Sequence, residues 1–436
     1  MRIPPRRQLV LAGVVVVAII STVLIAGAAK SDPAPTTASW VGSWAMAPTA
    51  AAPATPAVPA TATTPATKAV PSVSMDGFSN KTIRMTVHMS VGGSAVRVRL
   101  SNEFGTKALT IGHVTVAIPT KSGSGEVVPG TMHEVQFGGL STASIPRGGD
   151  LFSDPVAMTA KPDTDLAVSI WLPAATGPAT FHVTGRSTTW IGSGDHSEDI
   201  SNGGLSTKDP SWYYLTGVDV RNSTAAGTVV VLGDSVSDGF TATVDADHRW
   251  PDRLADRLGA LPAKDHAPGV LDLGTAGSSL GHDGSEIGVP QLGPSSTARL
   301  DNDVFAQTGV RVVIVELSIN DIWIFHDGPD QLIAELRQIA TQVHEHGLRV
   351  YVSTVSPWGG YKPYYTPALD KTRLGVNAYI RSTSDFDGYI DFDTLLRDPE
   401  TPTQLKPTWN SGDGIHPNDA GYLAMANAVP LKFLLP

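Results

Sequence analysis

The sequence predicts two regions of different fold class, an all-β region followed by an α/β region built on a doubly wound parallel sheet. Across residues 82–100, apolar and polar side chains alternate, which is typical of strands that bury only one face. In the second half of the chain, short uninterrupted apolar runs alternate instead with helical patterns. Strands without alternation are buried on both faces, as in a parallel sheet covered by helices.

We expect the all-β region to span residues 38–224 and to form a sandwich-like pair of sheets, because short alternating runs are separated by glycine-rich turns. Its first strand carries the sequence Trp-Val-Gly-Ser-Trp at residues 40–44. Residues 47–71 are almost wholly Ala, Pro and Thr, which predicts an extended insert with little to bury. The other alternating runs lie at residues 83–89, 96–100, 109–117, 166–172, 180–184 and 212–220.

The α/β region is expected to span residues 225–436. Its predicted buried strands lie at residues 228–232, 270–273, 310–317, 348–355 and 389–392. Between the third and fourth of these, apolar residues recur every three or four positions at residues 332–343, which indicates a helix packed on the sheet. Ligands of open α/β sheets bind at the carboxyl ends of the strands, so polar residues directly after these runs are the first candidates for a site.

Residues 1–37 predict export from the cytoplasm. Three arginines within the first seven residues precede an uncharged apolar run at residues 9–29, a pattern typical of an export signal. The run is about 21 residues long, enough to span a bilayer, and the small residues at 26–28 offer a cleavage site. A cleaved signal peptide and a retained membrane anchor both remain open. Either one places the rest of the chain outside the cytoplasm, secreted or anchored, because the arginines stay on the cytoplasmic side.

Composition excludes several classes of function. The formal net charge is −10 and no cluster of Lys or Arg follows the first residues, which argues against nucleic-acid binding. The sequence contains no cysteine, so a thiol nucleophile, a cysteine-ligated metal, disulfides and a lipidated cysteine are all excluded.

Ser235 directly follows the first predicted strand of the α/β region, with Gly233 before it and Gly239 after it. A serine in such a strand-to-helix turn lies at the open edge of the sheet, near the positive end of the next helix. Taken alone, Ser235 is explained equally well as the N-cap of that helix.

Asp413 and His416 lie three residues apart in the last predicted loop. A serine hydroxyl becomes a good nucleophile when a base accepts its proton, and histidine titrates near neutrality. A neighbouring carboxylate can hold the imidazole in the required tautomer. In isolation, the pair is also compatible with a surface turn. Asn320, after the third strand, could supply a side-chain amide at the same edge or simply form a turn.

Three stretches resemble conserved blocks of the SGNH/GDSL hydrolase family, and the resemblance covers roughly residues 225–436. They are Gly-Asp-Ser-Val-Ser-Asp-Gly at 233–239, Ser-Ile-Asn-Asp at 318–321 and Asp-Gly-Ile-His-Pro-Asn-Asp-Ala-Gly-Tyr at 413–422. The resemblance implies an SGNH-type, flavodoxin-like three-layer α/β/α fold. It also implies that Ser235 is the nucleophile, His416 the base and Asp413 its acid partner.

The same resemblance implies an oxyanion hole made by the backbone N–H groups of Ser235 and Gly277 and the side-chain amide of Asn320. Each such donor is worth about 10²–10³ in rate. Two positions depart from the family pattern: Asp272 stands where asparagine is usual, and Ser318 replaces a glycine. Residues 272–277 can also be interpreted as an ordinary glycine-rich turn.

We therefore predict an extracytoplasmic serine esterase that acts through an acyl-enzyme without a metal or organic cofactor. The two-region layout resembles extracellular SGNH esterases related to carbohydrate-acting esterases. This resemblance implies short acyl groups on a glycan or a similar polar alcohol as substrate. Trp323 and Trp358 follow the third and fourth strands and are candidates for substrate contact, with ordinary loop packing as the alternative. An acyltransferase and an inactive cell-surface glycan-binding protein remain as alternatives, and the oligomeric state is not predicted.

Overall fold

The computed structural model describes residues 39–54, 72–222, 224–262, 266–362 and 364–436. Residues Ala38–Pro436 belong to one compact unit. The predicted apolar span at residues 9–29 and most of the predicted insert at residues 47–71 lie outside the described residues. Of the helices that the structure describes, none combines the length and the apolar character needed to cross a membrane.

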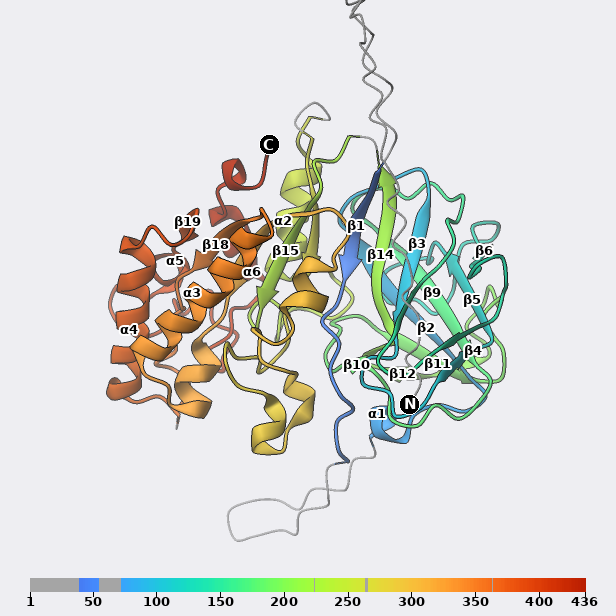
Figure 1. The fold of residues 1–436 in the computed structure, drawn as a ribbon, viewed down its shortest axis with the longest axis horizontal. Helices are drawn as coiled ribbons and strands as arrows, with labels where there is room; N and C mark the ends of the chain where they lie inside the picture. The colour runs from blue at the N-terminus through green and yellow to red at the C-terminus, as the bar shows by residue number, and fades with distance from the viewer. Residues whose placement is uncertain (1–38, 55–71, 223, 263–265, 363) are drawn as a thin grey trace, which may run out of the picture. The chain divides into compact units, whose positions relative to one another are not determined.

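An antiparallel β-sandwich forms the first region (Figure 1). Its larger sheet contains β2 (Lys81–Met89), β5 (His113–Ala117), β6 (His133–Glu134), β9 (Thr164–Leu172), β11 (Thr189–Ser193) and β12 (Leu205–Asp209), in the order β12-β11-β2-β9-β5-β6. The second sheet contains β1 (Ser39–Ala45), β3 (Val96–Ser101), β8 (Asp150–Phe152) and β14 (Leu215–Asn222), in the order β1-β14-β3-β8. Small elements complete it: α1 (Val73–Asp76), the pair β4 (Leu109–Ile111) and β7 (Ala143–Ile145), and the pair β10 (Phe181–His182) and β13 (Trp212–Tyr213).

Side chains from the inner faces of both sheets form a single core, which confirms the predicted all-β fold class. Ile83 of β2 and Val98 of β3 are both fully buried in it. The alternation along β2 predicts an exposed outer face, but the structure covers that face with loops. Arg84 is buried there and donates hydrogen bonds to the carbonyl oxygens of Gly125 at 2.6 Å and Asp199 at 2.7 Å. The charged side chain is tolerated because backbone carbonyls satisfy it.

A five-stranded parallel sheet forms the second region. Its strands are β15 (Thr228–Gly233), β16 (Gly269–Asp272), β17 (Val310–Glu316), β18 (Arg349–Ser353) and β19 (Gly388–Ile390). They pair in the order β16-β15-β17-β18-β19, and all the pairings are parallel. This is the flavodoxin-like order of a doubly wound sheet, as predicted, with the topological switch point between β15 and β17.

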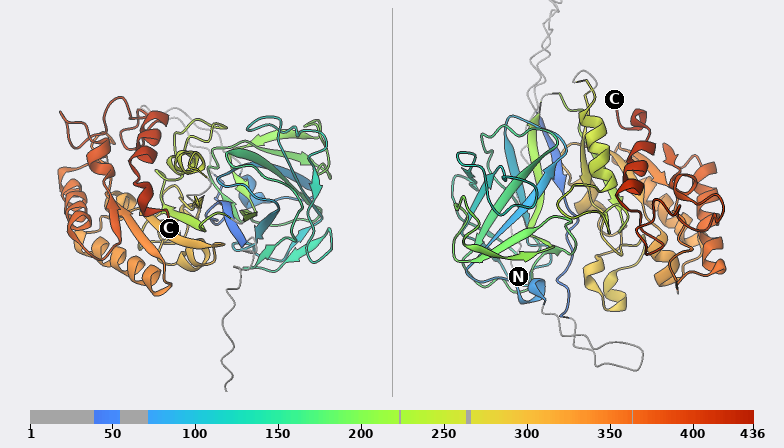
Figure 2. Two further views of the ribbon diagram at one scale, coloured as in Figure 1. Left: turned by 90° about the horizontal axis from the view of Figure 1, so that it is seen from above. Right: turned by 180° about the vertical axis from the view of Figure 1, so that it is seen from behind.

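Helices cover both faces of this sheet (Figures 1 and 2). The main helices are α2 (Trp250–Gly259), α3 (Pro329–Glu345), α4 (Pro367–Ser382), α5 (Phe392–Leu396) and α6 (Asp419–Ala428). Short turns of 3-10 or π type lie at η2 (Gly284–Ile287), η3 (Pro290–Leu292), η4 (Asp301–Phe305), η5 (Asp321–Phe325) and η6 (Leu431–Phe433).

Successive residues of β15 pack into opposite layers, as the pleat of a strand requires. Val229 lies in the core on the side of α2 and α6, whereas Val230 lies in the core on the side of α3 and α4. Both side chains are fully buried. A strand enclosed in this way has no polar face, which explains why its sequence is a continuous apolar run.

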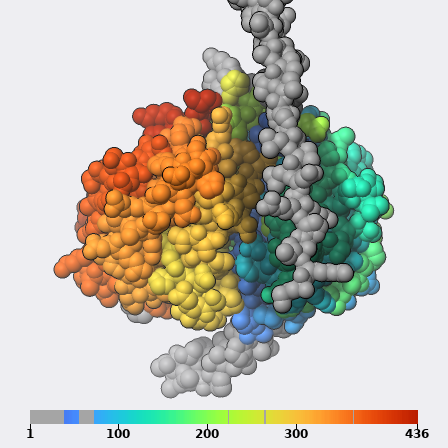
Figure 3. All heavy atoms as spheres, in the orientation of Figure 1, coloured from blue at the N-terminus to red at the C-terminus, as the bar shows by residue number. Residues whose placement is uncertain are grey.

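Strand β1 belongs to the sandwich but also packs directly on the parallel sheet. The N–H of Gly42 lies 3.1 Å from two acceptors, the carbonyl oxygen of Thr308 and the hydroxyl of Thr228. A Cβ atom on Gly269 of β16 would lie 2.1 Å from the Gly42 oxygen, so the two backbones meet without side chains between them. In Figure 3 the blue segment that follows β1 lies against the yellow part of the α/β region. Ala45 and Ala47 accordingly join the core of that region.

We expect loss of the buried cation Arg373 to destabilise the α/β region. Arg373 is 1% exposed and forms ion pairs with Asp370 and Asp393, each at 2.6 Å. Arg373→Met should lower the free energy of unfolding by about 3–5 kcal/mol, because it leaves the buried Asp370 carboxylate without its cation, whereas Asp393 keeps its pair with Arg381. Urea denaturation would measure this. Arg337→Met removes an exposed pair with Asp385 and serves as the control, with an expected loss below about 1 kcal/mol. Equal losses would contradict the prediction.

Candidate active site

Ser235 lies in the turn that directly follows β15, at the carboxyl edge of the parallel sheet. Its hydroxyl oxygen is 2.8 Å from Nε2 of His416. On the other side of the imidazole ring, Nδ1 lies 2.6 Å from Oδ2 of Asp413. With the ring proton on Nδ1, Nε2 is free to accept the serine proton. The structure thus brings together the three side chains that the sequence suggests as nucleophile, base and acid.

The loop before α6 closes around the Asp413 carboxylate. Oδ1 accepts hydrogen bonds from the backbone N–H groups of Ile415 at 3.0 Å and His416 at 2.9 Å. Burial alone would raise the pKa of Asp413, but the hydrogen bonds from His416 and Ile415 hold that pKa well below its usual range. The carboxylate therefore stays ionised near neutral pH. Gly414 has a φ of +86°, and a Cβ atom there would lie 2.2 Å from the backbone of Gly360, so this turn requires glycine.

Phe240, which the sequence analysis does not single out, lies against the ring of His416. The two ring centroids are 4.8 Å apart, and Phe240 is 39% exposed, so it forms part of the surface beside the base. Its carbonyl oxygen accepts a hydrogen bond from the Tyr422 hydroxyl at 2.7 Å. Thr241 donates to the carbonyl of Pro417 at 2.8 Å. These contacts join the Ser235 turn to the His416 loop, and no local sequence signal announces them.

The three expected oxyanion donors also lie at strand ends, after β15, β16 and β17. Among the described residues, the backbone N–H groups of Ser235 and Gly277 donate no hydrogen bond, which leaves both available. The Asn320 amide nitrogen donates to the carbonyl of Ser278 at 2.8 Å, and its oxygen accepts from the Trp323 indole N–H at 3.0 Å. These two contacts set the orientation of the amide. Its second N–H remains for a ligand.

Ser318 adopts the conformation that explains why the family usually has glycine there. Its φ is +96°, in a region that costs a side chain about 1–3 kcal/mol. Its hydroxyl is buried and has no hydrogen-bond partner among the described residues. The backbone shape before Asn320 is therefore kept despite the substitution, at the cost of local strain.

The structure places the two candidate aromatic residues differently from each other. Trp323 is half-buried, and its ring centroid lies 5.4 Å from that of Tyr361 and 5.1 Å from that of Tyr364. Trp358 is 0% exposed and packs edge-on against Tyr365 at 5.2 Å. Trp358 therefore offers no face to a substrate, which corrects the interpretation of this residue as a substrate contact. Burial of the loop after β18 in the core, which the sequence did not reveal, is the reason.

Asp272, at the family's asparagine position, has a cation as its partner. Its Oδ2 lies 3.1 Å from an Arg249 nitrogen, and Arg249 also pairs with Asp252 at 2.8 Å. Burial raises the pKa of Asp272 to about 7, although Arg249 opposes that shift. The Arg249 guanidinium also lies 5.6 Å from the ring centroid of Trp212 in β13. The carboxylate thus fits a charged network that the sandwich helps to enclose.

Buried polar groups also support the Ser235 turn from beneath. The Ser237 hydroxyl donates to Glu316 of β17 at 2.9 Å and lies 3.2 Å from the indole N–H of Trp250. Asp234 is fully buried and accepts a hydrogen bond from the Val236 N–H at 2.9 Å. Burial raises the pKa of Glu316 well above its usual range and that of Asp234 to about 7. The turn is thereby fixed to the neighbouring strand and to α2.

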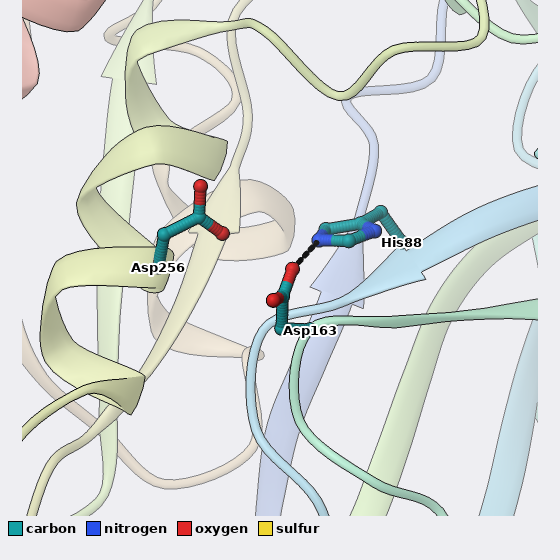
Figure 4. A group of neighbouring side chains, drawn as sticks. All are labelled: His88, Asp163 and Asp256. Carbon is teal, nitrogen blue, oxygen red and sulfur yellow. Dashed lines mark ion pairs between the residues drawn. The ribbon is translucent and has the colours of Figure 1, made fainter.

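Three groups of described residues have the spacing of a cation site. Two of them share His88 and form one cluster, the third forms a second cluster, and neither cluster includes Ser235, Asp413 or His416. In the first, His88 Nε2 lies 3.3 Å from Asp163 and Nδ1 lies 2.9 Å from Asp165. Figure 4 shows Asp256 on α2 near the same ring. Burial opposes a charge on His88, but the neighbouring carboxylates, Asp165 among them, raise its pKa to about 9. An imidazolium suits these contacts, and a metal ion would have to displace one of its protons.

The second cluster comprises Asp321, Asp327 and Glu335. Asp321 is fully buried, and its Oδ1 accepts a hydrogen bond from the Leu280 N–H at 2.8 Å. Its Oδ2 has no hydrogen-bond partner in the part of the chain that the structure describes. Burial raises the pKa of Asp321 to about 7, and Glu335 adds to the shift. A bound proton can therefore balance the charge of this cluster at mildly acidic pH.

We expect Asp321 to make the free energy of unfolding depend on pH. An unfolded aspartate has a pKa near 3.9, so the folded state binds the additional proton between about pH 4 and pH 7, and stability falls as the pH rises through that window. Asp321→Asn should flatten this decline. Between about pH 5 and pH 8, the free energy of unfolding of the variant should rise relative to that of the wild type by on the order of 1 kcal/mol or more. Urea denaturation at both pH values would measure it. Asp330→Asn, an exposed carboxyl, is the control, and parallel curves for all three proteins would contradict the prediction.

Comparison with known proteins identifies the α/β region. Residues 231–424 match the model of the GDSL-like lipase/acylhydrolase family. No curated protein sequence matches the chain. An aryl esterase structure from M. smegmatis is 18% identical, covering 48% of this chain and 99% of that one, with a TM-score of 0.38. A family two carbohydrate esterase from Clostridium thermocellum, solved with cellohexaose, is 12% identical, covering 81% and 91%, with a TM-score of 0.36. Likenesses this slight bear on neither reaction nor substrate, so the identification depends on the family match: residues 231–424 form a GDSL-like lipase/acylhydrolase domain.

Proposed function

We propose that this protein is a serine esterase in which Ser235, His416 and Asp413 hydrolyse carboxylic esters through an acyl-enzyme. The observation that carries the proposal is the pair of contacts in series, 2.8 Å from Ser235 to His416 and 2.6 Å from His416 to Asp413. The family of the domain is one of ester hydrolases, which agrees with this chemistry.

In the first half of the reaction, Ser235 Oγ attacks the acyl carbon while His416 Nε2 takes its proton. The carbonyl oxygen becomes an oxyanion, and Asp413 stabilises the imidazolium. The alcohol then leaves with the proton from His416. In the second half, His416 takes a proton from water as the water attacks the acyl group, and the acid leaves as Ser235 regains its proton.

The oxyanion is stabilised by the backbone N–H groups of Ser235 and Gly277 and by the free N–H of the Asn320 amide. These donors come from three different strand ends, so the sheet fixes their spacing before a substrate arrives. Preorganised donors are effective because they need no rearrangement as charge develops.

As substrate we propose short acyl groups on a glycan or a similar polar alcohol, met outside the cytoplasm by a protein that residues 9–29 export or anchor. The aromatic group of Trp323, Tyr361 and Tyr364 supports this choice. Trp323 contacts Asn320 through its indole N–H, and Tyr364 is 50% exposed, so aromatic faces lie beside the proposed oxyanion donor. Such faces suit sugar rings.

Replacing the nucleophile tests the function directly. Ser235→Ala should lower turnover of p-nitrophenyl esters by about 10⁶, by analogy with serine-protease triads. The test would use the acyl series from acetate to palmitate, with the highest kcat/KM expected for the short chains. Ser382→Ala is the matched control: it removes an exposed hydroxyl at the end of α4, away from the Ser235 turn, and should keep full turnover. Equal activity in wild type and Ser235→Ala would reject the esterase. Turnover that appears only when an alcohol acceptor is added would instead indicate an acyltransferase.

A second prediction concerns the Asn320 amide. Trp323→Phe keeps an aromatic ring but removes the N–H that contacts the amide oxygen, so only the contact with the Ser278 carbonyl still sets the orientation of the amide. We expect kcat to fall about 10-fold, less than the 10²–10³ expected for removal of a donor. Steady-state kinetics on p-nitrophenyl acetate would measure it. Tyr364→Phe, in the same aromatic group, should leave kcat unchanged, and an equal loss in both variants would speak against the orienting role of Trp323.

A further inference from the structure

A histidine of the β-sandwich reaches into the first conserved block of the hydrolase domain. His182 in β10 places Nε2 2.9 Å from Oδ1 of Asp238, and its Nδ1 lies 2.9 Å from the carbonyl oxygen of Ala47. The two side chains are 2% and 1% exposed. Since both ring nitrogens face acceptors, the ring must donate from both, which makes it a buried imidazolium paired with a carboxylate.

The other oxygen of Asp238 points to the loop that carries an expected oxyanion donor. Oδ2 accepts a hydrogen bond from the Ala276 N–H at 3.2 Å, and Ala276 directly precedes Gly277. The two turns are in close contact, since a Cβ atom on Gly274 would lie 2.6 Å from the Asp238 nitrogen. Asp238 therefore joins the turn of Ser235 to the loop of Gly277 through one carboxylate.

We infer that His182 is a positioning residue for the esterase reaction: it fixes the Asp238 carboxylate, which in turn holds the Ala276–Gly277 backbone so that the Gly277 N–H is directed at the oxyanion. The inference goes beyond the proposed function and rests on it. The sandwich is then part of the active site, because without it Asp238 would have no cation at Oδ1 to fix its orientation.

A second histidine also joins the sandwich to the hydrolase domain. It serves as a control that distinguishes the positioning role of His182 from mere attachment of the two regions. His88 of β2 lies 3.3 Å from Asp247 of the hydrolase domain, so it too joins the sandwich to that domain. Among the described residues, however, Asp247 accepts no hydrogen bond from the loop that carries Gly277. Loss of His88 should weaken the junction without moving an oxyanion donor.

The experiment uses the full chain with His182→Leu, His182→Gln, Asp238→Asn and the control His88→Leu. Steady-state kinetics on p-nitrophenyl acetate would give kcat and KM. We expect kcat of His182→Leu and Asp238→Asn to fall about 10- to 100-fold with KM nearly unchanged, because a donor is misdirected rather than removed. Glutamine can place a donor near the position of Nε2, so His182→Gln should recover part of kcat. His88→Leu should keep the wild-type kcat, even if its thermal unfolding temperature falls as much as that of His182→Leu.

A readout that does not depend on turnover completes the test. Amide hydrogen exchange of peptides covering residues 272–280 should rise in His182→Leu and not in His88→Leu, because only the former frees the Ala276 N–H. Unchanged exchange there, or a kcat loss matched by His88→Leu, would overturn the inference. An inactive wild type with raised exchange in His182→Leu would instead reject the proposed esterase and leave the loop contact standing. If His182→Leu fails to fold, the kcat of His182→Gln and the hydrogen exchange of that variant test the inference instead.

Discussion

Parallel pairing of the five strands is the constraint on which the site depends. Strands that run in one direction end at one edge, and Ser235, Gly277 and Asn320 each follow a different one of the three neighbouring strands β15, β16 and β17. Because β15 lies between the other two, the serine is flanked on both sides by expected donors. The interval between neighbouring strands therefore sets the spacing of these groups.

Much of this arrangement could be predicted from the sequence, because the signals are local. Enclosed strands show as apolar runs, and the site residues lie in short stretches directly after them. What could not be predicted depends on contacts between distant segments. The pairs His182–Asp238 and Arg249–Asp272 leave no trace in local sequence, and the burial of Trp358 follows only from the packing of its loop. The position of Trp323 after β17 suggests a substrate contact, but it does not reveal that the indole N–H donates to Asn320.

Charge beneath the nucleophile is distributed unevenly. Asp238 and Asp272 each face a cation, supplied by the sandwich in one case and by the start of α2 in the other. Asp234 and Glu316 have hydrogen bonds but no cation at contact distance among the described residues, and burial raises the pKa of both. Burial also raises the pKa of Asp272 to about 7, the same value as for Asp234, although Asp272 faces Arg249. Protonation of these buried acids limits the negative charge near the edge of the sheet at which the proposed oxyanion forms.

The position of β1 has a consequence for the order in which the chain can assemble. This strand precedes every other described element, but its pairing partner β14 ends at Asn222, and Gly42 contacts Thr308. Translation therefore has to reach Thr308 before β1 can make all its contacts. Contacts between such distant positions are slow to form. Strand β1 is consequently among the last elements to complete its contacts. It packs between two regions that have to be present first.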